Sequence, residues 1–480
     1  MITSNYINGV WQPALDGASY DVTNPADNSY IAHVPDSSGD DARAAVDAAA
    51  AALPAWRARS ARDRAQILKR WHAAIVANAD DLSLIISNEQ GKPQAEARGE
   101  VAYGASYVEW FAEEAVRAYG DVIPEPARGK KMLVLKEPVG VVAAITPWNF
   151  PLAMIARKIA PALAAGCTVV AKPAEDTPIT ALALASLAAQ AGIPPGVLNI
   201  ITSSRERTPA VAQAWQNDGR VRKITFTGST AVGKLLARGA ADTLKKLSLE
   251  LGGNAPFLVF EDADLDAAVN GLMAAKFRNG GQTCVSPNRI YVHDNVYASF
   301  AEKLAARVGA LKVGPATEAD SQIGPMINAR AVDKIATHVT DAQSKGAEVL
   351  CGGERLPGLG PNYYAPTVLG EATHEMLLAH EETFGPVVPL LRFRDEDHVA
   401  ALANDTPFGL AAYFFTQNIG RVWRMAERLE TGIVGINEGA LAAEAAPFGG
   451  VKESGYGREG SRYGLEDYMH TKYLCIGGMK

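Results

Sequence analysis

The segment at residues 167–200, CTVVAKPAEDTPITALALASLAAQAGIPPGVLNI, indicates the fold. It opens on a short β-branched run, continues into a stretch rich in Ala and Leu, and ends on a second β-prone run, GVLNI. Short strands that alternate with helices in this way are typical of a parallel sheet that is covered by helices on both faces. The segment therefore predicts one strand–helix–strand unit of an α/β protein.

The alternation continues on both sides of this segment. Downstream, TPAVAQAWQN, VRKITFTG and AVGKLLARGAADTL predict helix, strand and helix, and a second α/β run extends from about Asn254 to about Glu444. Upstream, residues 138–156 carry no charge and approach the length of a membrane span. Their three prolines instead predict a buried strand, a turn and a helix start, because a kinked backbone is costly in lipid. The region before Gly120 has mostly helical spacing.

Composition limits the class of protein. A chain of 480 residues predicts two or three domains, and its net charge of −7 without a basic block argues against a nucleic-acid partner. The four cysteines lie far apart without a CxxC pair, which argues against a disulfide framework or a zinc site. The N-terminus lacks a signal-peptide pattern. We therefore expect a cytoplasmic protein with no metal and no membrane association.

A glycine-rich turn follows the predicted strand KITF. Gly228, Gly233 and Lys234 nearly match the phosphate loop of nucleoside triphosphatases, but Leu235 replaces the hydroxyl residue that would hold Mg²⁺. Such a hydrolase is therefore disfavoured. A helix that begins near Ser229 would still direct its N–H groups at an anion. A turn that uses glycine only for its positive φ explains the same pattern.

Lys172 and Glu175 stand just after another predicted strand, where open α/β sheets bind ligands. A carboxylate there would accept hydrogen bonds from a ribose diol and repel a 2′-phosphate. A solvated Lys/Glu pair on a loop is the alternative.

Three residues are candidates for covalent chemistry. Cys284, in RNGGQTCVSPNR (278–289), is either a nucleophile or one of the small buried residues that cysteine often is. Glu250, in an apolar run before two glycines, is either a buried paired carboxylate or a general base. Asn149, in TPWNFP, either stabilises an oxyanion or forms a turn. His293 lies in a strand-like run, which disfavours a cysteine hydrolase.

Seven motifs in order along nearly the whole chain resemble the aldehyde dehydrogenase superfamily: TPWNFP, KPAEDTP, FTGST, LELGG, GQTC, EETFGP and PFGGVKESGYGRE. The resemblance implies two doubly wound α/β domains and a small β oligomerisation arm. The implied parts are an NAD-binding domain (1–119 and 138–253), a catalytic domain (254–445), and the arm with the C-terminal segment (120–137 and 446–480). A homodimer or homotetramer is the expected assembly.

The resemblance also implies the catalytic roles. Cys284 would attack the aldehyde to form a thiohemiacetal, with Asn149 holding the oxyanion, and oxidation would leave a thioester. Glu250 would activate the water that hydrolyses this thioester, and Lys158 and Glu459 match positions linked to proton relay. Relatives that transfer the acyl group to coenzyme A lack such a glutamate, so a free acid is the expected product.

Seven residues are expected to bind the cofactor. Trp148 and Ser229 match contacts on the pyrophosphate side, and Glu382 and Phe384 match residues that position the nicotinamide ribose and ring. The other three are Lys172, Glu175 and Gly228. Because the carboxylate of Glu175 would face the 2′-phosphate, we predict NAD rather than NADP.

Two arginines narrow the substrate. Arg157 and Arg278 match positions that bind the distal carboxylate in succinate-semialdehyde dehydrogenases, the members that the chain most resembles, and Phe448 is a further expected substrate contact. We therefore predict succinate semialdehyde as the substrate. Ala442 and Ala443 stand where such enzymes often place a serine near the carboxylate. Glutarate semialdehyde, 2-oxoglutarate semialdehyde or a broader aldehyde range therefore stay open.

Overall fold

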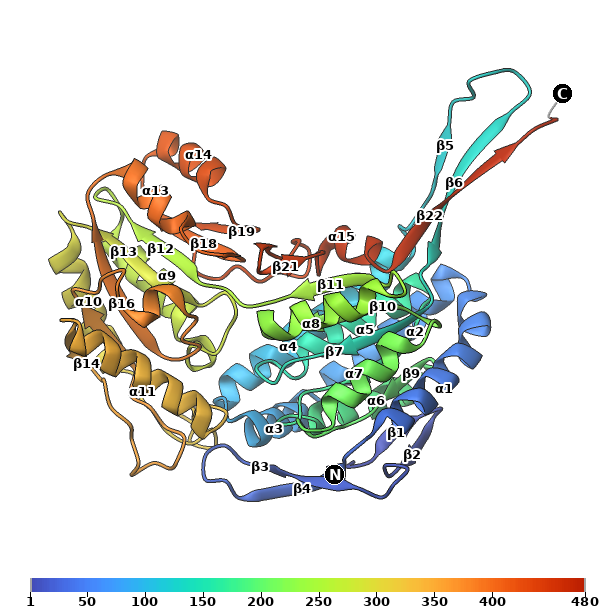
Figure 1. The fold of residues 1–480 in the computed structure, drawn as a ribbon, viewed down its shortest axis with the longest axis horizontal. Coiled ribbons are helices and arrows are strands. Elements are labelled where there is room, and N and C mark those ends of the chain that lie inside the picture. The colour runs from blue at the N-terminus through green and yellow to red at the C-terminus, as the bar shows by residue number, and fades with distance from the viewer. Residues whose placement is uncertain (1, 479–480) are drawn as a thin grey trace.

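The structure is a computed structural model that describes residues 2–478. Figure 1 shows two α/β units side by side, with a narrow arm of three strands that extends away from the first unit. This arrangement confirms the predicted fold class of two α/β domains with a small β arm.

The first unit is built on an eight-stranded sheet with the order β2-β1-β9-β8-β7-β10-β11-β21. Its five inner strands run parallel, and the strands at its two ends are antiparallel. The strands are β1 (Asn5–Ile7), β2 (Val10–Gln12), β7 (Val141–Ile145), β8 (Thr168–Lys172), β9 (Leu198–Ile200), β10 (Val221–Thr227), β11 (Lys246–Glu250) and β21 (Gly455–Tyr456).

Helices cover both faces of this sheet. Successive residues of a strand point to opposite faces, so Val142 and Ala144 pack in one core while Val141 and Ala143 pack in the other. The first core includes α2 (Ala61–Ala77), α3 (Ala79–Gln90), α4 (Gln94–Ala115), α5 (Ala153–Ala165) and α6 (Ile179–Gln190). The second includes α1 (Gly39–Arg57), α7 (Thr208–Asn217) and α8 (Thr230–Ala241). Burial on both faces explains why β7 is apolar throughout.

The second unit has a seven-stranded sheet with the order β14-β15-β16-β13-β12-β18-β19, parallel except for β14. Its strands are β12 (Ala255–Val259), β13 (Pro287–His293), β14 (Glu348–Cys351), β15 (Thr367–Gly370), β16 (Val387–Phe393), β18 (Ala411–Phe415) and β19 (Ile433–Ile436). One face packs on α9 (Leu265–Lys276) and α10 (Tyr297–Gly309). The other packs on α11 (Ala329–Ser344), α12 (Leu377–His380), α13 (Glu396–Asn404) and α14 (Ile419–Arg428).

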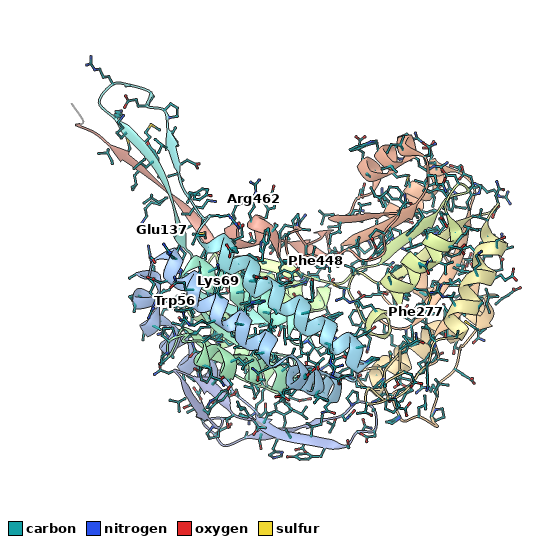
Figure 2. All side chains as sticks on the ribbon, turned by 180° about the vertical axis from the view of Figure 1, so that it is seen from behind. Trp56, Lys69, Glu137, Phe277, Phe448 and Arg462 are labelled. Atoms are coloured by element: carbon teal, nitrogen blue, oxygen red, sulfur yellow. The ribbon has the colours of Figure 1, made fainter. Side chains whose placement is uncertain are left out.

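The arm contains β5 (Asp121–Ile123), β6 (Lys131–Pro138) and β22 (Met469–Ile476), which follows α15 (Ser461–Glu466). The C-terminal strand β22 pairs with β6 along its whole length, from Met469 opposite Pro138 to Ile476 opposite Lys131. At the base of the arm, labelled in Figure 2, Glu137 binds Lys472 at 2.7 Å and Arg57 at 3.2 Å. The terminal strand thus finds a partner edge within its own chain.

The N-terminal region differs from the expectation of mostly helix. Four strands precede α1: β1 and β2 form a hairpin, and so do β3 (Ser19–Thr23) and β4 (Tyr30–Pro35). The first hairpin turns at Asn8 and Gly9, both with positive φ, which is the Asn-Gly signal of a tight hairpin. Figure 1 shows β3 and β4 running from the first unit toward the second, where the Asn362 amide donates to Pro25 O at 2.7 Å.

Two short strands complete the fold near the junction of the units, β17 (Phe408–Gly409) and β20 (Val451–Lys452), which pair with each other. The predicted domain boundaries stay a prediction, although β21 adds part of the C-terminal segment to the first sheet. No helix within residues 2–478 is long and apolar enough to cross a membrane.

Candidate active site

The turn before Cys284 has an unusual backbone. Asn279, Gly280 and Gly281 all have positive φ, at 53°, 61° and 79°, within the short 3-10 segment Arg278–Gly281. An added Cβ at Gly281 would lie 2.3 Å from Gly385 O, so only glycine fits there. The sequence NGG therefore allows a tight left-handed turn that ends three residues before the cysteine.

The LELGG motif approaches the same cysteine from the first unit. A Cβ at Gly253 would lie 2.5 Å from the backbone oxygen of Cys284, so glycine permits close contact between the two chain segments. Glu250, at the end of β11, lies two residues before this Gly-Gly pair and is only 2% exposed.

A cavity of about 330 Å³ collects most of the predicted site residues. Figure 2 shows Phe448 at the junction of the two units, and Phe277, which precedes Arg278, in the second unit. Ten predicted residues line the cavity: Trp148, Asn149, Arg157, Gly228, Ser229, Arg278, Cys284, Glu382, Phe384 and Phe448. Five predicted residues lie outside its lining: Lys158, Lys172, Glu175, Glu250 and Glu459.

Asn149 is held firmly beside the cysteine turn. Its side-chain Nδ2 donates to Gln282 O at 2.9 Å, and its backbone oxygen accepts from Lys92 Nζ at 2.8 Å and Asn279 Nδ2 at 2.9 Å. Cys284 itself is half-buried, and burial raises the pKa of its thiol to about 12, which the nearby Arg157 partly opposes. The resting residue is therefore a thiol, and its activation requires a base.

A buried charge cluster lies behind the cavity. The Glu459 carboxylate forms ion pairs with both Arg157 and Lys158, and all three side chains are at most 2% exposed. Burial lowers the pKa of Lys158, while Glu459 opposes this shift. Burial also tends to lower the pKa of Arg157, but Glu459 outweighs it and the guanidinium stays charged.

Glu250 adjoins this cluster. Neither carboxylate oxygen has a hydrogen-bond partner among the residues that the structure describes. Burial, and next the charge of Glu459, raise the pKa of Glu250 well above its ordinary range. Phe448 connects the cluster to the cavity, because its backbone exchanges two 2.8 Å hydrogen bonds with Glu459 and its ring lies 4.5 Å from the Arg157 guanidinium.

Arg278 has different surroundings. Its guanidinium lies 4.8 Å from the centre of the Phe150 ring and 5.5 Å from that of Tyr103. Within residues 2–478 it forms no ion pair at 4.0 Å or less. Contact with aromatic faces stabilises a cation without neutralising its charge, so Arg278 can still bind an anion.

The side of the cavity at α8 suits a dinucleotide. Ser229 caps α8 with its side chain, and a Cβ at Gly228 would lie 2.4 Å from the Phe226 ring, so this turn requires glycine. Gly228 and Ser229, at this helix N-terminus, line the cavity, and the first N–H groups of a helix have no carbonyl partner within it, as anion sites require. Opposite, Trp148 and Phe384 meet edge to face at 5.6 Å. Glu382 accepts from Gly253 N at 3.2 Å, and burial raises its pKa to about 7.

Lys172 and Glu175 form an ion pair of 3.2 Å at the end of β8. Lys172 is 2% exposed, and the Glu175 side chain is 28% exposed. Burial opposes ionisation of Glu175, but Lys172 outweighs it and lowers the pKa of this carboxyl.

Sequence reasoning missed several residues around the site. Tyr103 and Phe150 flank Arg278, and Phe150 could have been found because it belongs to the TPWNFP motif. Lys92 and Glu100 form a fully buried ion pair, and Glu100 accepts hydrogen bonds from Leu152 N and Ala153 N at the start of α5. Only the folded chain brings these residues together.

Arg289, which closes the cysteine segment, has a structural role that the sequence left open. It is fully buried, and its guanidinium donates to the backbone oxygens of Asn254, Leu402 and Ala403 at 2.9–3.1 Å. It therefore joins β13 to the end of α13.

Residues 11–474 match the sequence profile of the aldehyde dehydrogenase family. A 3-sulfolactaldehyde dehydrogenase of Pseudomonas putida is 54% identical over 99% of this chain and 97% of the relative. The NADP(+) succinate-semialdehyde dehydrogenase of Escherichia coli K12 and a glutarate-semialdehyde dehydrogenase of Pseudomonas putida KT2440 are each 54% identical over 98% of this chain and 97% of the relative. A crystal structure described as an E. coli NADP-dependent enzyme matches with a TM-score of 0.97 and 53% identity, over 99% of this chain and 98% of that chain.

The prediction that Glu175 selects NAD over NADP is wrong. The E. coli relative is named for NADP(+), and the matching crystal structure is of an NADP-dependent enzyme. The physical reason lies in the pairing of Glu175 with Lys172. A carboxylate that is already compensated by a buried ammonium repels an incoming phosphate much less than an isolated carboxylate does.

Proposed function

The chain belongs to the aldehyde dehydrogenase family, and we propose that it oxidises an aldehyde with an anionic group at its far end, succinate semialdehyde first of all, to the acid with NADP. The observation that carries the substrate class is Arg278, a cation that forms no ion pair of 4.0 Å or less within residues 2–478 and lies on the wall of the cavity that also contains Cys284. The three relatives are named for succinate semialdehyde, glutarate semialdehyde and 3-sulfolactaldehyde, which share a distal carboxylate or sulfonate.

The residues present fit a nicotinamide dinucleotide. The start of α8, with Gly228 and Ser229, would hold the phosphates, while Glu382 and Phe384 would hold the ribose and ring. Lys172 would meet the 2′-phosphate side, with Glu175 as its partner. When bound, the nicotinamide accepts the hydride from the substrate carbon.

Cys284 begins the reaction. Its thiol loses a proton, its sulfur forms a bond to the aldehyde carbon, and the carbonyl oxygen becomes an oxyanion. The Asn149 amide, fixed by its bond to Gln282 O, and the backbone N–H of Cys284 stabilise that oxyanion. After loss of the hydride the acyl group stays on the sulfur as a thioester.

Glu250 serves as the base. Its raised pKa makes its carboxylate a strong proton acceptor, first for the thiol and then for the water that attacks the thioester carbon. An added Cβ at Gly449 would lie 2.8 Å from Glu250 Oε1, so glycine at this position leaves room for the carboxylate. Glu459 and Lys158 provide the next proton-carrying groups. Water breaks the carbon–sulfur bond and releases the acid and the thiol.

Substrate length is the open choice within this class. Part of the cavity wall has no side-chain hydroxyl, because it consists of Gly439, Ala440, Leu441 and Ala442. These residues therefore offer no side-chain hydrogen bond to the distal carboxylate of the substrate, which depends on the arginines. Glutarate semialdehyde is the second candidate, since a relative named for it is as similar as the succinate-semialdehyde enzyme.

The direct test measures the absorbance of reduced nicotinamide with purified protein. Succinate and glutarate semialdehydes, 3-sulfolactaldehyde and the uncharged aldehyde butanal are each tried with NADP and NAD. We expect kcat/KM to be much higher for the anionic aldehydes than for butanal, and higher with NADP. Equal kcat/KM for butanal and succinate semialdehyde would contradict the proposed substrate class.

We further propose that the protein acts in the cytoplasm as a homodimer or homotetramer assembled through the arm. On the arm, the side chains of Val122, Leu135 and Tyr473 are 78%, 41% and 55% exposed. A group of exposed apolar side chains is typical of a surface that binds another protein. Light scattering of the protein and of the triple variant V122S/L135S/Y473S would test this, since an unchanged mass would contradict the role of the arm.

A further inference from the structure

The segment Glu381–Phe384 has two faces. It lies between α12 and β16, and the side chains of Glu382 and Phe384 line the catalytic cavity. The side chains of Glu381 and Thr383 instead meet α11, which packs behind the segment. Because the two pairs alternate along four consecutive residues, whatever fixes Glu381 and Thr383 also restrains the two cavity residues.

His338 is the α11 residue that meets this second face, on which Thr383 is buried and the Glu381 side chain is 56% exposed. It is 2% exposed and stands in the buried stripe of the helix with Val332, Ile335 and Val339. Its Nδ1 lies 3.1 Å from Thr383 Oγ1, and its Nε2 lies 3.4 Å from Glu381 Oε2. Both ring nitrogens therefore contact the segment.

The donor and acceptor roles follow from the chemistry of the partners. Burial, and then the charge of Lys334, lower the pKa of His338, while Glu381 and Asp341 oppose this shift. The ring is therefore neutral at pH 7. A carboxylate only accepts, so Nε2–H donates to Glu381 and Nδ1 accepts from the Thr383 hydroxyl.

The segment needs such support because its backbone is strained. Phe384 has a φ of 56°, a conformation that a bulky residue keeps only when its surroundings impose it. Asn288 holds the backbone, since its Oδ1 accepts from Thr383 N at 3.2 Å and its Nδ2 donates to Glu381 O at 2.7 Å. His338 contacts the side chains of the same two residues, Thr383 and Glu381.

We propose that His338 is a positioning residue that orients Glu382 and Phe384 for the dinucleotide. It touches neither the cavity nor the reacting atoms, and it acts through Thr383 and Glu381. The assignment rests on the proposed function, because the ligand of Glu382 and Phe384 is taken to be the nicotinamide half of the cofactor.

The test measures the Kd of NADP⁺ by calorimetry without aldehyde, for wild type, H338A and H338N. The asparagine amide oxygen can take the place of Nδ1 and accept from Thr383, so H338N should rescue binding. H374A is the matched control, since His374 lies in the same unit and bonds Tyr291 Oη at 3.2 Å away from the cavity. Loss of these contacts should raise the Kd roughly five- to thirty-fold in H338A. H338N and H374A should stay within about threefold of wild type.

A second measurement covers the case in which H338A folds poorly. T383V removes the hydroxyl but keeps the side-chain shape, so T383V alone should raise the Kd even if H338A folds poorly. H338A should add less than its full effect to T383V, because both variants remove the contact between His338 and Thr383. The KM for aldehyde should stay unchanged in both variants. Three outcomes would overturn the positioning role of His338 but leave the proposed function standing. These are a Kd for H338A equal to that of wild type, no rescue in H338N, or full additivity of H338A with T383V. Wild-type protein that binds neither NADP⁺ nor NAD⁺ would overturn the proposed function, and the assignment with it.

Discussion

The surroundings of Arg157 and Arg278 can be compared directly, because both arginines line the same cavity. Arg157 is bound to the Glu459 carboxylate, which also binds Lys158, within a fully buried cluster. Arg278 lies between the rings of Tyr103 and Phe150. A cation that a protein carboxylate already compensates contributes to stability and proton transfer, whereas an uncompensated cation can still bind a substrate anion.

The largest effect is expected in the charge cluster. Glu250→Gln keeps the shape but removes the base, so kcat should fall by about 10²–10⁴-fold. Because the same carboxylate is proposed to take the proton of the Cys284 thiol, the burst of reduced cofactor seen by rapid mixing should also become slower. A variant that keeps the wild-type kcat would show that the buried carboxylate is not the base.

The buried charge cluster around Glu459 should also contribute more to the free energy of unfolding than the surroundings of Arg278 do. Glu459→Gln leaves Arg157 and Lys158 buried without a full countercharge, which should lower the free energy of unfolding by about 3–5 kcal/mol. Urea unfolding measures this loss. Glu466→Gln, which removes an exposed 3.1 Å pair with Lys136, is the control and should cost less than about 1 kcal/mol. Equal losses would remove the distinction between the two kinds of pair.

A change at Arg278, which lies between two aromatic rings, should alter substrate selectivity rather than stability. Arg278→Ala should lower kcat/KM for succinate semialdehyde roughly 10–150-fold, the effect of losing a charge-assisted contact of about 1.5–3 kcal/mol. Butanal should be oxidised as before, and the free energy of unfolding should change little. Arg278→Lys should be intermediate, because an ammonium keeps the charge but not the planar fork. The same fold-loss for both aldehydes would contradict the anion-binding role.

The pH dependence of thioester hydrolysis tests the role of Glu250 without a substitution. Burial raises the pKa of Glu250, so its protonated form persists to a higher pH than for an ordinary glutamate. A base acts only after it has lost its proton, and thioester hydrolysis should therefore speed up by at most tenfold per pH unit until that pKa is passed. The rise should be absent from the single-turnover hydrolysis rate of Glu250→Gln. Persistence of the rise in that variant would assign it to another group.

The smallest effect on activity is expected from a change at Glu175, which forms an ion pair with Lys172. Glu175 is compensated by Lys172, so Glu175→Gln should change the ratio of kcat/KM for NADP and NAD by less than about fivefold. Kinetics with the two cofactors at equal concentration measure this ratio. A change of a hundredfold would show that the carboxylate acts as a free charge after all.

Much of the molecule could be predicted from local pattern. The alternation of apolar runs gave β8, α6, β9 and α7 close to their places, because burial on both faces leaves a continuous apolar strand. The first N-terminal hairpin was missed, although Asn8-Gly9 carries a turn signal, because its strands of three residues have too little periodicity to detect. The second hairpin, with strands of five and six residues, was missed as well.

The sequence by itself determined the type of fold, the motifs and ten of the residues that line the cavity. Only the tertiary structure decided which charges form ion pairs: Glu175 with Lys172 and Arg157 with Glu459, whereas Arg278 forms none of 4.0 Å or less within residues 2–478. The reason is physical. The effect of a charge on a ligand depends on neighbours within a few ångströms and on burial, and Glu459 is 302 positions from Arg157 in the chain.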